Sequence, residues 1–138
     1  MKRVFLSAVI CTLALSCAVQ EKHTLKTAEA MEATEFAELM VLDSINKQET
    51  TAESVDLLLN ENPVDNRISL LVNNNTDCNI ILRFSGDQSY SLPIRKNFRN
   101  FIVIEKGNYS VGANLCNSRY VSSKTLTQSI NITISERE

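Results

Sequence analysis

The chain has 138 residues with a formal net charge of −2, and this length leaves room for one modest domain. Its basic residues form no concentrated footprint, which argues against nucleic-acid binding. With three glycines and one histidine, it holds neither a glycine-rich phosphate-binding fingerprint nor the ligand cluster of a zinc site.

The first sixteen residues read as a signal peptide. Lys2 and Arg3 give a positive start, and an uncharged run of apolar or small residues extends from Val4 to Ser16. A bilayer-spanning helix needs roughly 20 residues, so this run is too short to be one. It ends at Cys17 in the manner of a bacterial lipoprotein signal, in which the lipid transferase alkylates the thiol. We therefore expect cleavage before Cys17 and lipidation of Cys17; the alternative is an ordinary secretory signal with an incidental cysteine.

Residues 17–26 are expected to form the lipidated tether, followed by a helical segment over 27–63. Residues 27–47 are rich in Ala, Glu, Met and Leu and contain neither Gly nor Pro, which favours a helix. Acidic residues share the arc of its apolar ones, so amphipathicity is weak. The pattern leaves open whether this helix is solvent-exposed or loosely docked.

A second, shorter helix is expected over residues 51–60. Thr50 and Glu53 match a capping box, in which the two side chains bond to each other's backbone N–H groups. Pro63 closes this helix, because the residue before a proline is disfavoured in helical conformation.

From Arg67 onward the hydrophobic period changes to two, which predicts about seven short strands. The predicted strands cover residues 67–73, 78–84, 90–94, 101–104, 109–115, a weaker segment near Tyr120, and 130–134. Turn residues at Ser85-Gly86-Asp87 and Lys106-Gly107-Asn108 predict a turn and a hairpin. The continuous apolar run Phe101–Ile104 predicts a strand covered on both faces. The expected fold is mainly β: a small antiparallel β-sandwich over residues 64–138, preceded by the helical segment.

Two cysteines, Cys78 and Cys116, remain in the predicted mature chain besides Cys17. In an oxidising compartment two cysteines usually pair, which favours a disulfide over free thiols. Cys116 is out of phase with the apolar face of its strand and is expected just past the strand's end.

A basic cluster, Arg95, Lys96 and Arg99, lies between two predicted strands beside Phe98 and Phe101. Such a loop suits contact with an anionic glycan, a phospholipid headgroup or an acidic protein. The alternative is a solvated hairpin loop.

No catalytic residue, metal site or cofactor is expected. The one histidine, His23, lies in the tether without a partner cluster. The carboxylates at Glu29, Glu32, Glu35 and Glu38 lie on a predicted helix that offers no cleft, so they are interpreted as a solvated face rather than a glycosidase pair.

The strand region carries residues typical of a known family. They are Asn75-Thr76-Asp77-Cys78-Asn79-Ile80-Ile81-Leu82-Arg83-Phe84 with Gly86, Tyr90-Ser91-Leu92-Pro93, Phe101-Ile102-Val103, Lys106-Gly107-Asn108-Tyr109, Cys116, and Tyr120 with Ser122 and Lys124. Through them, residues 73–125 resemble a family of small lipoproteins from Flavobacteria-type Gram-negative bacteria, classed as a domain of unknown function. The residues Ile94-Arg95-Lys96-Asn97 stand where the family usually has a second proline and small residues. The resemblance implies a lipoprotein with Cys78 and Cys116 paired, and it implies no activity.

These observations together predict a lipid-anchored protein of the cell envelope, on the outer membrane, that is not an enzyme. We expect a binding or structural module whose partners are the membrane, through its lipid, and an envelope protein or glycan. The alternative is an accessory subunit of an envelope complex that docks through residues 27–60.

Overall fold

The computed structural model describes residues 17–60 and 63–136, with side chains from residue 26 onward. Its elements are α1 (Cys17–Leu59), β1 (Arg67–Asn74), β2 (Ile80–Ser85), β3 (Ser89–Ile94), β4 (Phe98–Glu105), β5 (Gly107–Asn114), β6 (Arg119–Leu126) and β7 (Ile130–Ile134). The signal peptide expected over residues 1–16 lies outside the described residues, as does the side chain of Cys17.

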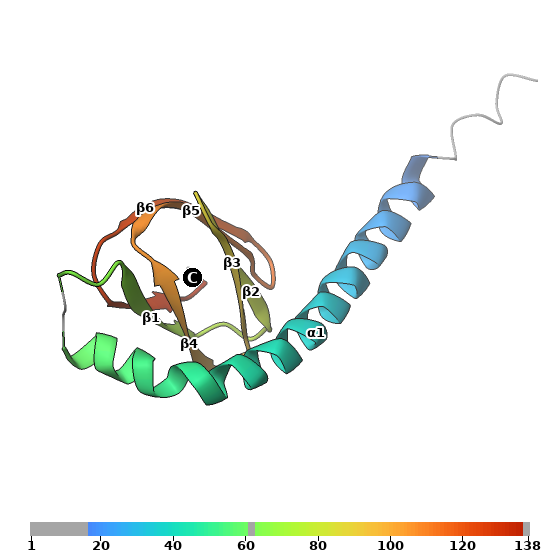
Figure 1. Cartoon of the computed structure of the whole chain (residues 1–138). Helices are drawn as coiled ribbons and strands as arrows, with labels where there is room; N and C mark the ends of the chain where they lie inside the picture. The colour runs from blue at the N-terminus through green and yellow to red at the C-terminus, as the bar shows by residue number, and fades with distance from the viewer. Residues whose placement is uncertain (1–16, 61–62, 137–138) are drawn as a thin grey trace, which may run out of the picture. The chain divides into compact units, whose positions relative to one another are not determined.

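The strands form two sheets (Figure 1), in the orders β4-β1-β7 and β3-β2-β5-β6. Every neighbouring pair is antiparallel except β1 and β7, which run parallel from Leu70 opposite Ile130 to Asn74 opposite Ile134. The expectation of an antiparallel arrangement is therefore wrong for this pair. The last strand of the chain lies beside the first, and the alternation of residues within a strand does not specify its neighbour.

One hydrophobic core cluster takes residues from both sheets. The three-stranded sheet contributes Ile68, Leu70, Val72, Ile104 and Ile134, and the four-stranded sheet contributes Ile80, Leu82, Phe84, Leu92, Ile94, Tyr109, Val111, Ala113 and Leu126. These are mostly the alternating apolar positions of the sequence, so the mainly β prediction is confirmed. Burying each large aliphatic or aromatic side chain contributes about 1.5–3 kcal/mol.

The turn at Lys106 joins the two sheets rather than two paired strands. β4 pairs with β1, whereas β5 pairs with β2 and β6. At the crossing, the Lys106 N–H donates to the carbonyl of Asn66 at 2.7 Å. The hairpin predicted here is wrong, because turn residues mark a change of direction but not the sheet that the next strand joins. The turn around Gly86, by contrast, joins β2 and β3, which do pair.

α1 is one helix without the expected break near Thr50. The hydroxyl of Thr50 donates to the carbonyl of Asn46 at 2.9 Å, and Thr51 donates to the carbonyl of Lys47. The predicted cap and the break before the second helix are therefore wrong, whereas residues 51–59 are helical as expected but continue α1. Inside a helix, a threonine hydroxyl bonds back to the carbonyl four residues earlier instead of capping. Residues 17–26, the expected tether, are helical as well.

No stretch of α1 is both long and apolar enough to cross a membrane.

Contacts within the chain divide it between Glu35 and Phe36 into two units. In the first unit, the side chains described from Lys26 to Ala30 are all exposed. The second unit contains all seven strands and the second half of α1. There, Leu57 is buried, and the buried hydroxyls of Ser54 in α1 and Ser69 in β1 lie 2.5 Å apart. The second half of α1 is therefore docked on the three-stranded sheet.

Candidate functional site

A groove of about 400 Å³ lies between the second half of α1 and the start of β4. It is lined by Met40, Asp43, Ser44, Lys47, Leu71, Pro93, Arg95, Phe98, Arg99, Asn100 and Phe101. Five of these side chains are apolar, and the volume falls within the range of small-molecule sites, roughly 300–1,000 Å³. This lining makes the groove the candidate binding site of the described part of the chain.

The structure brings two of the three predicted basic residues into this groove. Arg95 and Arg99 line it, and both side chains are exposed. Lys96 is exposed but is not part of the lining. Sequence reasoning missed the helical wall, to which Met40, Asp43 and Lys47 belong.

The backbone of the basic turn is held by the loop between β1 and β2. The N–H of Asn97 donates to the carbonyl of Thr76 at 3.2 Å, and the N–H of Lys96 donates to Oδ1 of Asn79 at 3.0 Å. Asn97 has a φ of 52°, a left-handed conformation that asparagine tolerates better than most residues. The turn is therefore fixed by tertiary hydrogen bonds, which the solvated-hairpin interpretation did not anticipate.

Asn74, at the end of β1, is the centre of this arrangement and is fully buried. Its Nδ2 donates to the carbonyls of Cys78 at 2.9 Å and Arg95 at 3.0 Å. Its Oδ1 accepts from the N–H and the hydroxyl of Thr76, at 3.1 and 2.7 Å. One side chain thus joins β1, the β1–β2 loop and the basic turn.

A disulfide joins Cys78 and Cys116, whose Cα atoms lie 5.5 Å apart. Cys78 lies in the loop before β2, and Cys116 lies just past the end of β5, as expected. The bond connects the loop that supports the basic turn to the connection between β5 and β6.

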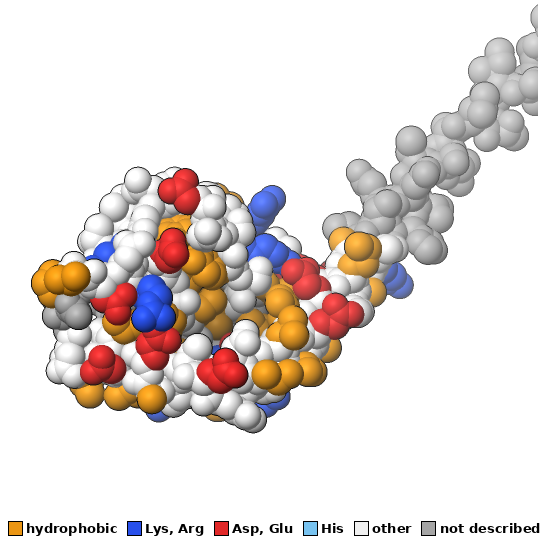
Figure 2. All heavy atoms as spheres, viewed as in Figure 1, with side chains coloured by type: hydrophobic (Ala, Val, Ile, Leu, Met, Phe, Trp, Pro, Cys, Tyr) orange, Lys and Arg blue, Asp and Glu red, His pale blue; other side chains and the backbone are white. Residues whose placement is uncertain are grey.

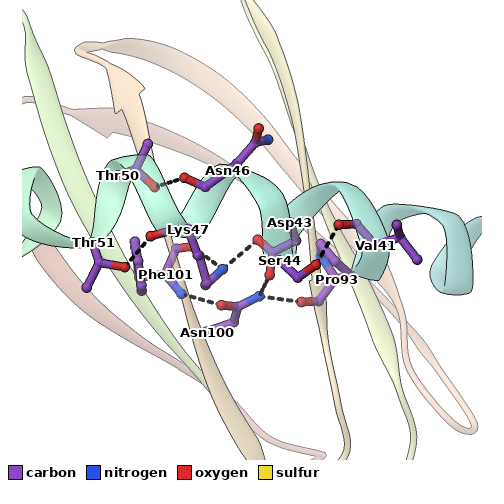
Figure 3. A network of polar contacts seen from close by, with 10 residues as sticks. All are labelled: Val41, Asp43, Ser44, Asn46, Lys47, Thr50, Thr51, Pro93, Asn100 and Phe101. Atoms are coloured by element: carbon purple, nitrogen blue, oxygen red, sulfur yellow. Dashed lines mark hydrogen bonds and ion pairs between the residues drawn. The ribbon is translucent and has the colours of Figure 1, made fainter.

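The helical wall of the groove is fixed by a polar network (Figure 3). Asn100 donates through Nδ2 to Oδ2 of Asp43 at 3.0 Å and to the carbonyl of Pro93 at 2.7 Å. The other oxygen of Asp43 pairs with Lys47 at 2.5 Å. The ammonium of Lys47 lies 4.6 Å from the centre of the Phe101 ring, a cation–π distance.

The charge of the groove comes from its arginines. Asp43 and Lys47 are only 16% and 25% exposed and compensate each other. Neither Arg95 nor Arg99 forms an ion pair with a side chain that the structure describes. The arrangement therefore places two guanidinium groups beside an apolar lining.

A protein-family model matches the chain. No curated protein and no solved structure matches the chain. The model of a domain of unknown function, DUF6759, matches residues 44–137, which extend from the middle of α1 through β7. All the groove residues except Met40 and Asp43 lie within that range. The chain therefore belongs to the DUF6759 family, a family of unknown function.

Proposed function

We propose that this protein is a non-enzymatic binding module of the cell envelope, anchored by lipid at Cys17, whose groove takes an anionic amphipathic ligand. The observation that carries the proposal is an apolar groove that is lined also by Arg95 and Arg99, neither of which forms an ion pair with a described side chain. The apolar lining favours a ligand with a hydrocarbon part, because burying it removes apolar surface from water. The guanidinium groups favour an acidic group, which each can bind through two parallel hydrogen bonds.

The hydrogen bonds behind the turn support this proposal. Arg95 is held through its own carbonyl by Asn74, and Asn97 is held by Thr76. A turn that is already ordered loses little conformational entropy when a ligand binds, which favours affinity. We infer that the scaffold is a small β-sandwich, and the core shared between the two sheets supports this inference.

A lipid anchor would suit such a module, because confinement at a membrane raises the local concentration of membrane-derived ligands. We place it on the outer membrane. The intact mass of protein extracted from membranes tests the anchor. We expect the mass of residues 17–138 plus a diacylglyceryl group, with or without a third acyl chain, whereas an unlipidated mass would remove the anchor from the proposal.

The groove is tested by fluorescence titration with a dansylated undecanoic acid, which carries a hydrocarbon chain and a carboxylate. Replacing Arg95 and Arg99 together by alanine should weaken binding at least about tenfold, because a hydrogen bond to a charged group contributes about 1.5–3 kcal/mol. The matched control is Lys96→Ala with Lys124→Ala, which removes the same charge outside the groove. Equal losses in both double variants, or none in either, would contradict the proposal.

A second candidate function is that of an accessory subunit docking through α1. The face of α1 that points away from the sheet, in unit 36–138, exposes large apolar side chains. They are Val41, Leu42, Ile45, Val55 and Leu59, each at least half exposed. Figure 2 shows hydrophobic and acidic side chains together along the part of α1 drawn in green in Figure 1.

The charged residues beside this apolar face indicate what kind of partner can bind to it. Glu38, Glu49 and Asp56 lie on the same side of the helix by their spacing. Within residues 36–59, the one cation, Lys47, lines the groove instead. A second copy would bring like charges together, and an anionic bilayer would be repelled. We therefore propose a partner protein that presents an apolar helix flanked by lysines or arginines.

This docking face is tested with a designed helical peptide that carries a stripe of leucines flanked by lysines. The control is the same peptide with glutamates in place of the lysines. The lysine peptide should bind, and Ile45→Ser with Val55→Ser should weaken it about tenfold through lost apolar burial. Equal binding of both peptides, or no effect of the variant, would reject the docking face. If the parent chain forms a dimer and the variant is monomeric, the face binds a second copy of the chain instead.

A further inference from the structure

The outer face of the four-stranded sheet carries a second hollow, of about 410 Å³, formed by β2, β5 and β6. It is lined by Arg83, Ser85, Ser110, Gly112, Ala113, Asn114, Arg119 and Val121. None of these residues is acidic. The hollow is separate from the groove at Arg95, with which it shares no residue.

The strand register places Gly112 at the centre of this hollow. Arg83 pairs with Gly112, and Gly112 pairs with Val121. Two residues along the strands in one direction, Ser85, Ser110 and Ser123 lie side by side on neighbouring strands. Two residues along in the other direction, Asn114 pairs with Arg119. Gly112, which has no side chain, therefore lies between Arg83 and the exposed Val121, and the second arginine, Arg119, lies two residues further along beside Asn114.

The backbone does not require glycine at position 112. Gly112 has no positive φ, and an added Cβ would meet only the carbonyl of Tyr120, at the ordinary contact distance of 3.5 Å. Gly86 differs, because a Cβ there would approach the Asn108 carbonyl to 2.5 Å. Gly112 thus matters for the space that its missing side chain leaves, not for the conformation of the strand.

The donors around this space suit an oxyanion. Arg83 also engages another group of the chain, but a guanidinium has five N–H donors and can serve more than one acceptor. Arg119 is exposed, and the hydroxyl groups of Ser85 and Ser110 can donate as well. Phosphate, sulfate and carboxylate groups match the planar fork of arginine.

We propose that this hollow binds a small soluble oxyanion, a phosphate, sulfate or carboxylate group, held over Gly112 between Arg83 and Arg119. The site is independent of the groove proposed above, so either can fail without the other.

The chain contains only three glycines, so their backbone amides provide a selective NMR readout. The nitrogen-15-labelled full chain is titrated in turn with inorganic phosphate, sulfate and glucuronate at constant ionic strength, with chloride as the reference. We expect a saturable shift of the Gly112 amide signal, while that of Gly107, which is not part of the lining, stays in place. The probe that saturates at the lowest concentration distinguishes an inorganic anion from an acidic sugar.

Two variants locate the site. Gly112→Val fills the hollow with a residue that favours strands and should abolish the saturable shifts of neighbouring amides such as Ala113. Arg119→Gln should weaken binding about tenfold, whereas Arg95→Ala with Arg99→Ala should leave it unchanged. The proposal is overturned if no probe saturates, if chloride produces the same shifts, or if folded Gly112→Val binds as the parent chain does.

Discussion

The side-chain amide of Asn74 donates to the backbone carbonyl of Arg95 at 3.0 Å and so joins the end of β1 to the turn that carries the groove's arginines. The same amide group reaches the carbonyl of Cys78, next to the disulfide. A fully buried asparagine thus connects the hydrophobic core to the candidate site. Its polar atoms are satisfied by backbone groups, as burial requires.

Replacing Asn74 by alanine should lower the free energy of unfolding by roughly 3 kcal/mol. The change removes one donor from each of two backbone carbonyls, which keep the Phe98 N–H and the Thr76 hydroxyl as partners, and it takes away the acceptor of the Thr76 N–H. A buried polar group left unpaired costs about 1–3 kcal/mol, and the lost hydrogen bonds to the carbonyls add to this cost. Urea unfolding measures the loss. The exposed neighbour Asn75 is the control, because its alanine variant should stay within about 0.5 kcal/mol. Equal effects of the two variants would show that the buried network contributes nothing.

Much of the strand region could be predicted from the sequence because one face of each strand enters the core. Ile130, Ile132 and Ile134, for example, are more buried than the two residues between them, as their alternation predicts. The partners of these strands could not be predicted. The local sequence indicates neither the parallel pairing of β7 nor the crossing between sheets at Lys106, because both depend on contacts between residues distant in sequence.

The candidate site could be predicted only where its residues are neighbours in the chain. Arg95 and Arg99 stood out as a basic cluster and do line the groove. Lys47 lies 54 residues before Phe101, whose carbonyl it approaches, and no pattern links the two. No feature of the sequence around Asn74 reveals that its side chain is buried.

Removing the disulfide should destabilise the chain by about 4 kcal/mol. Cys78 and Cys116 are 38 residues apart, and the chain-entropy model assigns this value to a loop of that length. Urea unfolding of Cys78→Ser with Cys116→Ser measures the change. A reducing agent should lower the stability of the parent chain to a similar degree and leave the double variant unaffected. A parent chain insensitive to reduction would contradict the assigned contribution.

Replacing Asn100 by alanine should loosen the second half of α1. The variant loses the hydrogen bonds to Asp43 and to the carbonyl of Pro93, for a cost of about 2 kcal/mol. Hydrogen exchange should accelerate over residues 36–59, because local opening follows the loss of docking contacts. Ser44→Ala is the control, since the exposed Ser44 hydroxyl donates to the carbonyl of Val41 in the same helix. Unchanged exchange in the Asn100 variant would mean that the network does not hold the helix.

Tyr109 makes the stability of the strand region depend on pH in the alkaline range. Its ring is buried against Phe84 and Tyr90, with ring centres 6.3 and 6.2 Å away, and its hydroxyl donates to the carbonyl of Glu105 at 2.8 Å. Burial raises the pKa of Tyr109 above its ordinary value of 10.0, and the neighbouring Tyr90 and Glu105 raise the pKa further. The folded chain therefore holds this proton more tightly than the unfolded chain.

Stability should consequently fall as the pH rises from about 10 through the folded pKa, because the unfolded chain releases the proton first. Below that window the contribution of Tyr109 is fully present. Tyr109→Phe should cost about 1 kcal/mol at neutral pH, through the lost hydrogen bond, and should show a smaller decline in alkali. Urea midpoints of both chains across this pH range measure the difference, and tyrosinate absorbance follows the ionisation directly. Parallel declines in the two chains would show that Tyr109 ionises as freely when folded as when unfolded.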